Sequence, residues 1–500
     1  MNPGSLGLWA LGAYMLTLLV VAEVARRART DLTPSDHFLA GRHLGVFVLF
    51  LTLYATAYSG NSLLGYPGEA YRRGFSWIMS TGFMISIIVT FHALVPRLRP
   101  IAVREGFVSP GDWVSFRFGS EPAGHALRVA VGGLMGLALA NFLLAQLIAM
   151  GHVTSEVTGG VIPYWAGVVG MAAMILFYET LGGMRAVSWT DAAQGVLMLV
   201  GLGALLAWLL GEAGGLGEVT RQIGVLRPEV VAVPDAEERA NWFSTILLLG
   251  LASVIYPQAI QRIYAAKSGR ALKRAFALMT FMPFTTTLVV TLIGLAAIPR
   301  FEGLGALQAD TVMPRLLGEW GASGALNSLF AVLVFVGALA AIMSTADSVL
   351  LSLGAVVAVD LLGKDREDPE TTRLGKRIAV LVMVVAVVLA LLPKLTLWRL
   401  IELKMELLIQ CVPAFLLALH WRRLRAMPCL AGVVVGALIA GGAALAGAER
   451  IEGVHVGVIG LAVNFAVLIG VHWAHRGGGR GSPVIPPQEP GSGCASSSAS

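Results

Sequence analysis

The chain has 500 residues, of which 56% are hydrophobic and only 13% are charged, and its mean hydropathy is +0.76. Soluble domains are about one quarter charged, so this composition excludes a soluble globular protein and indicates an integral membrane protein. The formal net charge of +6 does not indicate nucleic acid as a partner, because the basic residues lie in short loops between hydrophobic segments.

Windows of about 18 or more apolar residues predict thirteen transmembrane helices. In chain order they lie near residues 6–24, 44–66, 75–96, 127–150, 162–180, 186–211, 242–260, 275–298, 326–350, 377–393, 398–420, 428–447 and 455–474. The first segment lacks the basic start and cleavage site of a secretory signal, so we expect it to be retained as a span. Residues 476–500 are rich in Gly, Ser and Pro, which predicts a disordered cytoplasmic tail after a transmembrane domain of residues 1–475.

The charges of the loops predict the orientation. The loops at 97–128, 262–274, 364–377 and 422–425 are basic, whereas the loop at 212–241 carries more acids than bases. Because basic loops stay in the cytoplasm, this pattern predicts an N-terminus outside and a C-terminus inside a bacterial-type inner (plasma) membrane.

Two of the predicted spans contain helix-breaking residues. Segment 44–66 leads into a cluster with Gly60 and Pro67, and segment 242–260 contains Pro257. Transporters built from inverted repeats break corresponding helices near the middle of the membrane, although Gly and Pro are also tolerated in ordinary membrane helices. The pattern predicts an all-α, five-plus-five inverted repeat. Its repeats span about 44–211 and about 242–420, and its extra helices are 6–24, 428–447 and 455–474.

The segment GALAAIMSTADSVL (337–350) carries Ser344, Thr345 and Asp347 on an otherwise apolar stretch. A polar group in hydrocarbon is costly without a partner, so these residues indicate an ion or solute path. The alternative for the hydroxyls is a bond back to the carbonyl four residues earlier. We interpret the chain as a transporter.

Several motifs resemble those of the sodium/solute symporter family, whose members carry proline, pantothenate, monocarboxylates or sugars. They include DHFLAGRHLG (36–45), GGMRAVSWTDAAQGVLMLVG (182–201), YPQAIQRIYAAKS (256–268) and PAFLLALHWRR (413–423). The resemblance covers nearly the whole chain before the tail and implies a leucine-transporter-type fold. It also implies a sodium site formed by the backbone carbonyls of Ala55, Tyr58 and Ala341 with the hydroxyls of Ser344 and Thr345. Several oxygen ligands suit a hard cation, and no other metal and no cofactor is expected.

Two aspartates are candidates for the ion path. Asp191 resembles a family aspartate associated with sodium coupling, and its alternative role is to stabilise the start of a helix. Asp347 either lines the inner exit or pairs with a loop arginine. Ala57 stands where proline carriers of the family have an aspartate, so this segment is more similar to pantothenate-type members and favours an organic acid. Arg262 is expected to be a structural anchor at the inner membrane face.

The expected solute contacts come from both interrupted spans, from segment 75–96 and from the charged segment 398–420. They are Ser59, Asn61, Ser62, Ser80, Thr81, Tyr256, Gln258, Glu402, Lys404 and Glu406. Glu402 and Glu406 share one helical face, and Lys404 lies about 200° from each. We expect Lys404, or a helix terminus in segment 44–66, to meet a carboxylate of the solute. The alternative is that these charges snorkel to the outer surface.

The sequence therefore predicts sodium-coupled symport of a small organic solute into the cell by alternating access. The solute is expected to be a carboxylate such as a monocarboxylate, a pantothenate-like acid or an amino acid. A proton-coupled symporter and a non-transporting solute sensor that acts through a partner are the alternatives. An enzyme is not expected, because no histidines pair at metal-binding spacing within a span. The expected partners are the solute, sodium and the lipid bilayer, without nucleic acid or an obligate protein partner.

Overall fold

The computed structural model describes residues 3–27, 39, 42–365, 368–392 and 395–474. The side chains of residues 178–194 and of several other helical positions, Asn61 among them, are outside this description. The described chain is almost entirely helical, and its one sheet is the two-stranded hairpin of β1 (Arg450–Ile451) and β2 (Val454–His455). The all-α prediction is therefore confirmed.

The main helices follow the predicted order along the chain. They are α1 (Pro3–Arg27), α3 (Val46–Ala57), α4 (Tyr66–Arg73), α5 (Met79–Arg104), α6 (Pro110–Phe118), α7 (Gly124–Val157), α8 (Tyr164–Ala213), α9 (Leu216–Leu226), α10 (Ala236–Ala252), α11 (Pro257–Ala265), α12 (Gly269–Met279), α13 (Leu288–Ala297), α14 (Ala306–Ala309), α15 (Val312–Ala322), α16 (Ala325–Ala355), α17 (Pro369–Ala390), α18 (Leu397–Leu408), α19 (Ala418–His420), α20 (Ala426–Leu445) and α21 (Val456–Ala474). π-helical turns at Asn61–Gly65, Pro283–Thr287, Val356–Leu361 and Pro413–Leu417 join several of them.

Seven helices of the described chain are long and apolar enough to cross a bilayer, or eight if α10 and α11 count as one bent span. The count of thirteen spans and the five-plus-five repeat stay predictions. The predicted segments 162–180 and 186–211 form one helix, α8, so the boundary expected between them is not found. No proline lies within α8, and glycine lowers helix stability by only about 1 kcal/mol without ending a helix.

Both predicted interruptions are present. Helix α3 ends at Ala57, and Tyr58 has the non-helical angles φ −106° and ψ 81° before the π-helical turn that leads into α4. Helix α10 and the short 3-10 turn after it meet α11 at a bend of 50°, where Pro257 occupies the first position of α11. Proline is accommodated at this position because its missing N–H has no partner within the helix.

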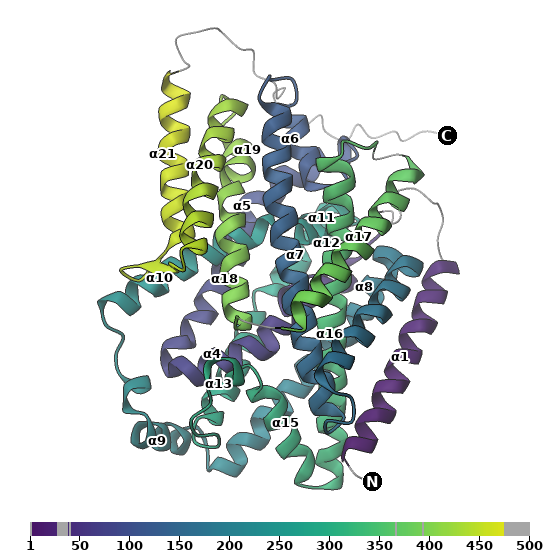
Figure 1. Ribbon diagram of the computed structural model, residues 1–500, viewed down its shortest axis with the longest axis vertical. Helices are drawn as coiled ribbons and strands as arrows, with labels where there is room; N and C mark the ends of the chain where they lie inside the picture. The colour runs from purple at the N-terminus through teal and green to yellow at the C-terminus, as the bar shows by residue number, and fades with distance from the viewer. Residues whose placement is uncertain (1–2, 28–38, 40–41, 366–367, 393–394, 475–500) are drawn as a thin grey trace, which may run out of the picture.

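The long helices run roughly along one direction, with α20 and α21 side by side at one edge of the bundle and α1 at the opposite edge (Figure 1). Helix α1 begins at the bottom of this view, which we call the N-terminal end, and α21 finishes at the top, which we call the C-terminal end. Helix α16 is central, and all of its residues from Gly337 to Ala355 are buried. The polar motif of α16 is thus enclosed by protein rather than by lipid.

Candidate functional site

The interruption after α3 packs directly against α16. A Cβ atom placed on Gly60 would lie 2.8 Å from Ile342 Cγ1 and 2.9 Å from Ala149 Cβ. The Gly60 N–H donates to Gln146 Oε1 at 3.1 Å, so α7 supplies the partner for one backbone group of this segment. The two stretches predicted to share an ion are therefore neighbours at Gly60 and Ile342.

The hydroxyl-bearing turn of α16 is fully buried. The Thr345 hydroxyl donates to the carbonyl oxygen of Ala341 at 3.0 Å, and the Ser348 hydroxyl donates to that of Ser344 at 2.9 Å. Thr345 thus makes the hydrogen bond to the carbonyl four residues earlier, which was the alternative to its role as an ion ligand. This bond also places two of the predicted oxygens, Ala341 O and Thr345 Oγ1, side by side. Ala55 and Tyr58 lie at the end of α3 and at its cap.

Arg262 connects three helices beside this turn. Its guanidinium donates to Thr52 Oγ1 of α3 at 2.9 Å and to Ser348 Oγ of α16 at 2.7 Å. It also donates to the Gln258 carbonyl of its own helix, α11, at 3.2 Å. Thr52 precedes Ala55 by three residues and Ser348 follows Ser344 by four, so Arg262 lies about one helical turn from the predicted sodium ligands.

Asp347 and Asp191 are the two predicted ion-path aspartates. Asp347 is fully buried, and neither of its carboxylate oxygens has a hydrogen-bond partner among the described residues. The side chain of Asp191 lies outside the described residues. An enclosed carboxylate without a donor is costly, which makes Asp347 a group that needs a cation or a proton.

A cavity of about 80 Å³ lies in the middle of the bundle. Four of the predicted solute contacts line it, namely Ser59, Ser62, Tyr256 and Lys404. Of the other predicted contacts whose side chains are described, none lines the cavity: these are Ser80, Thr81, Gln258, Glu402 and Glu406. The Ser80 hydroxyl is instead bonded to the Thr291 hydroxyl at 3.1 Å.

Lys404 holds its ammonium group against aromatic rings. Its Nζ atom lies 3.1 Å from the ring centroid of Phe142 and 5.3 Å from that of Tyr256. These two rings are stacked, with centroids 5.7 Å apart and an interplanar angle of 12°. Phe142, on α7, was not singled out from the sequence, because an apolar ring in a span has no signal that separates it from ordinary packing.

Glu402 and Glu406 point into a different, charged cluster. Arg399 of α18 donates to Glu402 at 3.3 Å and to Glu406 at 3.2 Å, and Arg450 of β1 also pairs with Glu402. His455 of β2 lies 3.6 Å from Glu406 and accepts or donates a bond with Thr245 of α10. The two glutamates therefore lie on the side of α18 that the C-terminal hairpin covers, and Lys404 lies on the side of the cavity.

A group of four packed rings includes one that lines the central cavity and one that lines a second hollow of about 630 Å³. Tyr66 lines the cavity and Trp398 lines the hollow, and their ring centroids are 6.0 Å apart. Trp77 packs edge-on against Trp398 at 4.5 Å, and Phe83 completes the group. We call these four residues the aromatic lid.

Asp310 forms hydrogen bonds with two segments beside the aromatic lid. Its Oδ2 atom accepts a bond from the backbone N–H of Leu397 at 2.8 Å, at the start of α18, and Oδ1 accepts one from Arg72 of α4 at 3.3 Å. Burial raises the pKa of Asp310 to about 6, against the opposing effect of Arg72. No sequence pattern indicated this residue, because its partners lie far from it along the chain.

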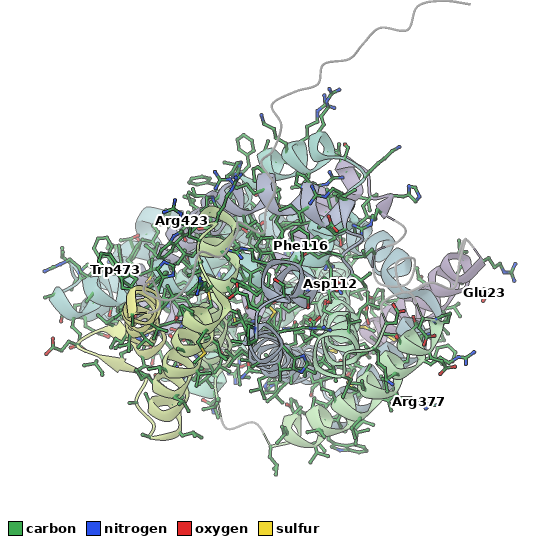
Figure 2. All side chains as sticks on the ribbon, turned by 90° about the horizontal axis from the view of Figure 1, so that it is seen from above. Glu23, Asp112, Phe116, Arg377, Arg423 and Trp473 are labelled. Atoms are coloured by element: carbon green, nitrogen blue, oxygen red, sulfur yellow. The ribbon has the colours of Figure 1, made fainter. Side chains whose placement is uncertain are left out.

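Helix α6 lies at the C-terminal end of the bundle (Figure 1). Asp112 caps this helix by accepting bonds from the N–H groups of Val108 and Ser109 at 2.7 and 2.9 Å. Figure 2 shows Asp112 and Phe116 near the middle of this end, with Trp473 and Glu23 towards opposite edges.

A family model described as the sodium:solute symporter family matches residues 37–436. The osmoregulated proline transporter OpuE of Bacillus subtilis is 26% identical over 437 residues, which cover 86% of each chain. The sodium/pantothenate symporter of Escherichia coli is 27% identical over 445 residues, which cover 86% of this chain and 88% of that protein. A solved structure of a Na+-coupled sialic acid symporter, in a substrate-bound outward-open state, superimposes with a TM-score of 0.75 at 17% identity, over 94% of this chain and 97% of that one.

Proposed function

Because the chain belongs to the sodium:solute symporter family, we propose that it carries sodium and a small organic solute together into the cell by alternating access. Its relatives are transporters rather than enzymes. The single observation that supports a shared ion site in this chain is the contact of Gly60 with Ile342. It brings the interrupted segment to the turn of α16 that carries Ala341, Ser344 and Thr345.

We propose that sodium is held by the carbonyl oxygens of Ala55, Tyr58 and Ala341 and by the hydroxyls of Ser344 and Thr345. Sodium bound there would replace the bond between the Thr345 hydroxyl and the Ala341 carbonyl. Neutral oxygens with fixed positions compensate a monovalent cation for its lost hydration. Since the ligands come from α3 and α16, bound sodium would hold the two helices together.

The solute is proposed to bind in the central cavity, with Ser59, Ser62 and Tyr256 beside it and its carboxylate near Lys404. Relatives described as proline and pantothenate transporters carry solutes with a carboxylate, so a monocarboxylate, a pantothenate-like acid and an amino acid are all candidates. Asn61 is kept as a further candidate contact. This proposed site does not include the remaining predicted contacts, which are Ser80, Thr81, Gln258, Glu402 and Glu406.

We propose that the N-terminal end of the bundle faces outward and that the C-terminal end faces the cytoplasm of a bacterial-type plasma membrane. In this orientation the aromatic lid closes the outer side of the cavity, and Arg262 holds α11 against α3 and α16 on the inner side. One sodium ion carried with a monovalent carboxylate moves no net charge, so the sodium concentration gradient would drive accumulation, with about 1.4 kcal/mol for each tenfold difference in sodium concentration. For a zwitterionic amino acid, the membrane potential would add about 2.3 kcal/mol for each 100 mV.

A proton-coupled symporter is the second candidate, because Asp347 is buried without a donor among the described residues. A solute sensor is the third. The test is uptake of labelled proline, pantothenate and propionate into proteoliposomes, under a sodium gradient and a proton gradient imposed separately. Flux driven by sodium alone supports the proposal, flux driven by protons alone replaces it, and no flux with any solute favours the sensor.

A further inference from the structure

The central cavity contains one charged side chain among the described residues that line it. Lys404 supplies a cation, and the remaining polar groups are the hydroxyls of three serines and three tyrosines. The other lining residues are apolar and include Met84, Met279 and Met405. A solute that fits this lining needs one anionic group and an otherwise apolar body.

The ammonium group of Lys404 lacks a counter-charge. Within the described chain it forms no ion pair and no hydrogen bond, and its neighbours are the rings of Phe142 and Tyr256. The Tyr256 hydroxyl is also buried without a partner among the described residues. An enclosed cation and an unused O–H donor on a ring whose centroid lies 5.3 Å away are costly unless each meets an acceptor. A carboxylate would satisfy both.

None of the described residues that line the cavity is acidic, so none of them offers a negative charge to an ammonium group of a solute. The two nearest glutamates along the chain, Glu402 and Glu406, are engaged by Arg399, Arg450 and His455 on the other side of α18. An amino acid would place its ammonium close to that of Lys404, with only hydroxyls and carbonyls to accept its protons. Like charges at short range in a site away from water repel strongly.

The volume of the cavity limits the size of the solute that can bind. A volume of about 80 Å³ holds roughly five to eight water-sized groups, since one water needs about 10–15 Å³ measured in this way. Monocarboxylates of about three to six carbon atoms have this number of non-hydrogen atoms. Pantothenate is roughly two to three times as large.

We infer that the solute is a short monocarboxylate without an ammonium group, and that its carboxylate lies between Lys404 Nζ and the Tyr256 hydroxyl. This inference rests on the proposed symport function and separates this chain from relatives that are described as proline transporters. Propionate is an expected solute, whereas L-alanine, which differs from propionate by one ammonium group, is not.

The test measures sodium-driven uptake of labelled propionate, L-alanine, L-proline and pantothenate by the wild-type protein in proteoliposomes. Propionate should be taken up with a half-saturating concentration at least about tenfold lower than that of L-alanine, a difference that corresponds to about 1.4 kcal/mol. Sodium-driven uptake of L-alanine, proline or pantothenate that equals or exceeds that of propionate overturns the inference and leaves symport intact. If sodium drives none of the four solutes, the proposed function fails and the inference fails with it.

Variants test the position of the carboxylate. Lys404→Met should raise the half-saturating concentration of propionate at least about tenfold, and Tyr256→Phe, which removes only a hydroxyl, should raise it by a smaller factor. Lys273→Met is the matched control, because Lys273 is exposed on α12. A cooperative thermal unfolding transition in detergent, measured without propionate, shows whether each variant is folded, and the shift on adding propionate with sodium measures binding. Unchanged propionate uptake in both Lys404→Met and Tyr256→Phe would overturn the assignment.

Discussion

Asp310 and Leu397 are joined by a hydrogen bond of 2.8 Å between the aspartate carboxylate and the backbone N–H that opens α18. The bond ties the segment between α13 and α15 to the helix that carries both Trp398 of the aromatic lid and Lys404 of the cavity. A single buried carboxylate therefore links the N-terminal end of the bundle to the proposed solute site.

Asp310 should make the folded protein more stable as the pH falls towards 4. Its pKa is raised from 3.8 to about 6 by burial, so below about pH 6 the folded state binds a proton that the unfolded state still lacks. Linkage then gives about 1.4 kcal/mol of added stability for each pH unit between about 6 and 4, and none above that range. Thermal unfolding in detergent at pH 7.5 and pH 5.5 measures the effect.

The control for this pH effect is Asp310→Asn. An asparagine oxygen can still accept the bond from Leu397, but the side chain does not titrate. The variant should therefore lack the added stability of about 1.4 kcal/mol for each pH unit that Asp310 gives the wild type between about pH 6 and 4. Equal pH dependence in the variant and the wild type would show that other groups cause it.

Ser344→Ala and Thr345→Val should each weaken sodium activation of transport. Both substitutions remove one proposed sodium ligand and change little in volume. The sodium concentration for half-maximal uptake should rise at least about tenfold, or about 1.4 kcal/mol. Thr154→Val is the control, since it removes a fully buried hydroxyl from α7 that has no bonding partner among the described residues. An unchanged sodium requirement in both α16 variants would remove them from the ion site.

Gly60→Ala should abolish transport. The added methyl group would meet Ile342 and Ala149 at less than 3.0 Å, and overpacking of this kind costs about 1–3 kcal/mol or displaces the interrupted segment from α16. Uptake at saturating sodium measures the loss. Gly45→Ala, at the N-cap of α3 with nothing within 4 Å of its added Cβ, should transport normally. If Gly60→Ala retained full activity, tight packing at this contact would not be needed.

Arg262→Met should lower stability and weaken sodium activation together. The change removes the hydrogen bonds from Arg262 to Thr52, Ser348 and the Gln258 carbonyl, and a hydrogen bond from a charged donor contributes about 1.5–3 kcal/mol. Because Thr52 and Ser348 belong to the two helices of the proposed sodium site, these helices should separate more easily. Unfolding temperature and the sodium concentration for half-maximal uptake report the two effects. Arg262→Lys should be intermediate, since it keeps the charge but loses the fork of donors.

Local patterns in the sequence were sufficient for the elements that depend on nearby residues. The interruption at Pro257 follows from the chemistry of proline, and the opposite positions of Glu402 and Lys404 follow from the helical repeat. Contacts between segments that are distant in the chain leave no such pattern in the sequence. Nothing near Lys404 in the chain indicates that Phe142 packs against it, and nothing near Asp310 indicates Leu397. The continuity of α8 was missed because a hydropathy window detects spans and not the helix between them.

The position of Glu402 and Glu406 has a consequence for how the protein is made. Arg450 follows Glu402 by 48 residues, so a ribosome completes α18 before it reaches the arginine and His455. During that interval Arg399 is the one partner of the two carboxylates, among the described residues, that has been synthesised, and charged side chains make membrane insertion of a lone helix unfavourable. We expect α18 to remain at the translocon until α20 and α21 are made, and to enter the bilayer together with these two helices.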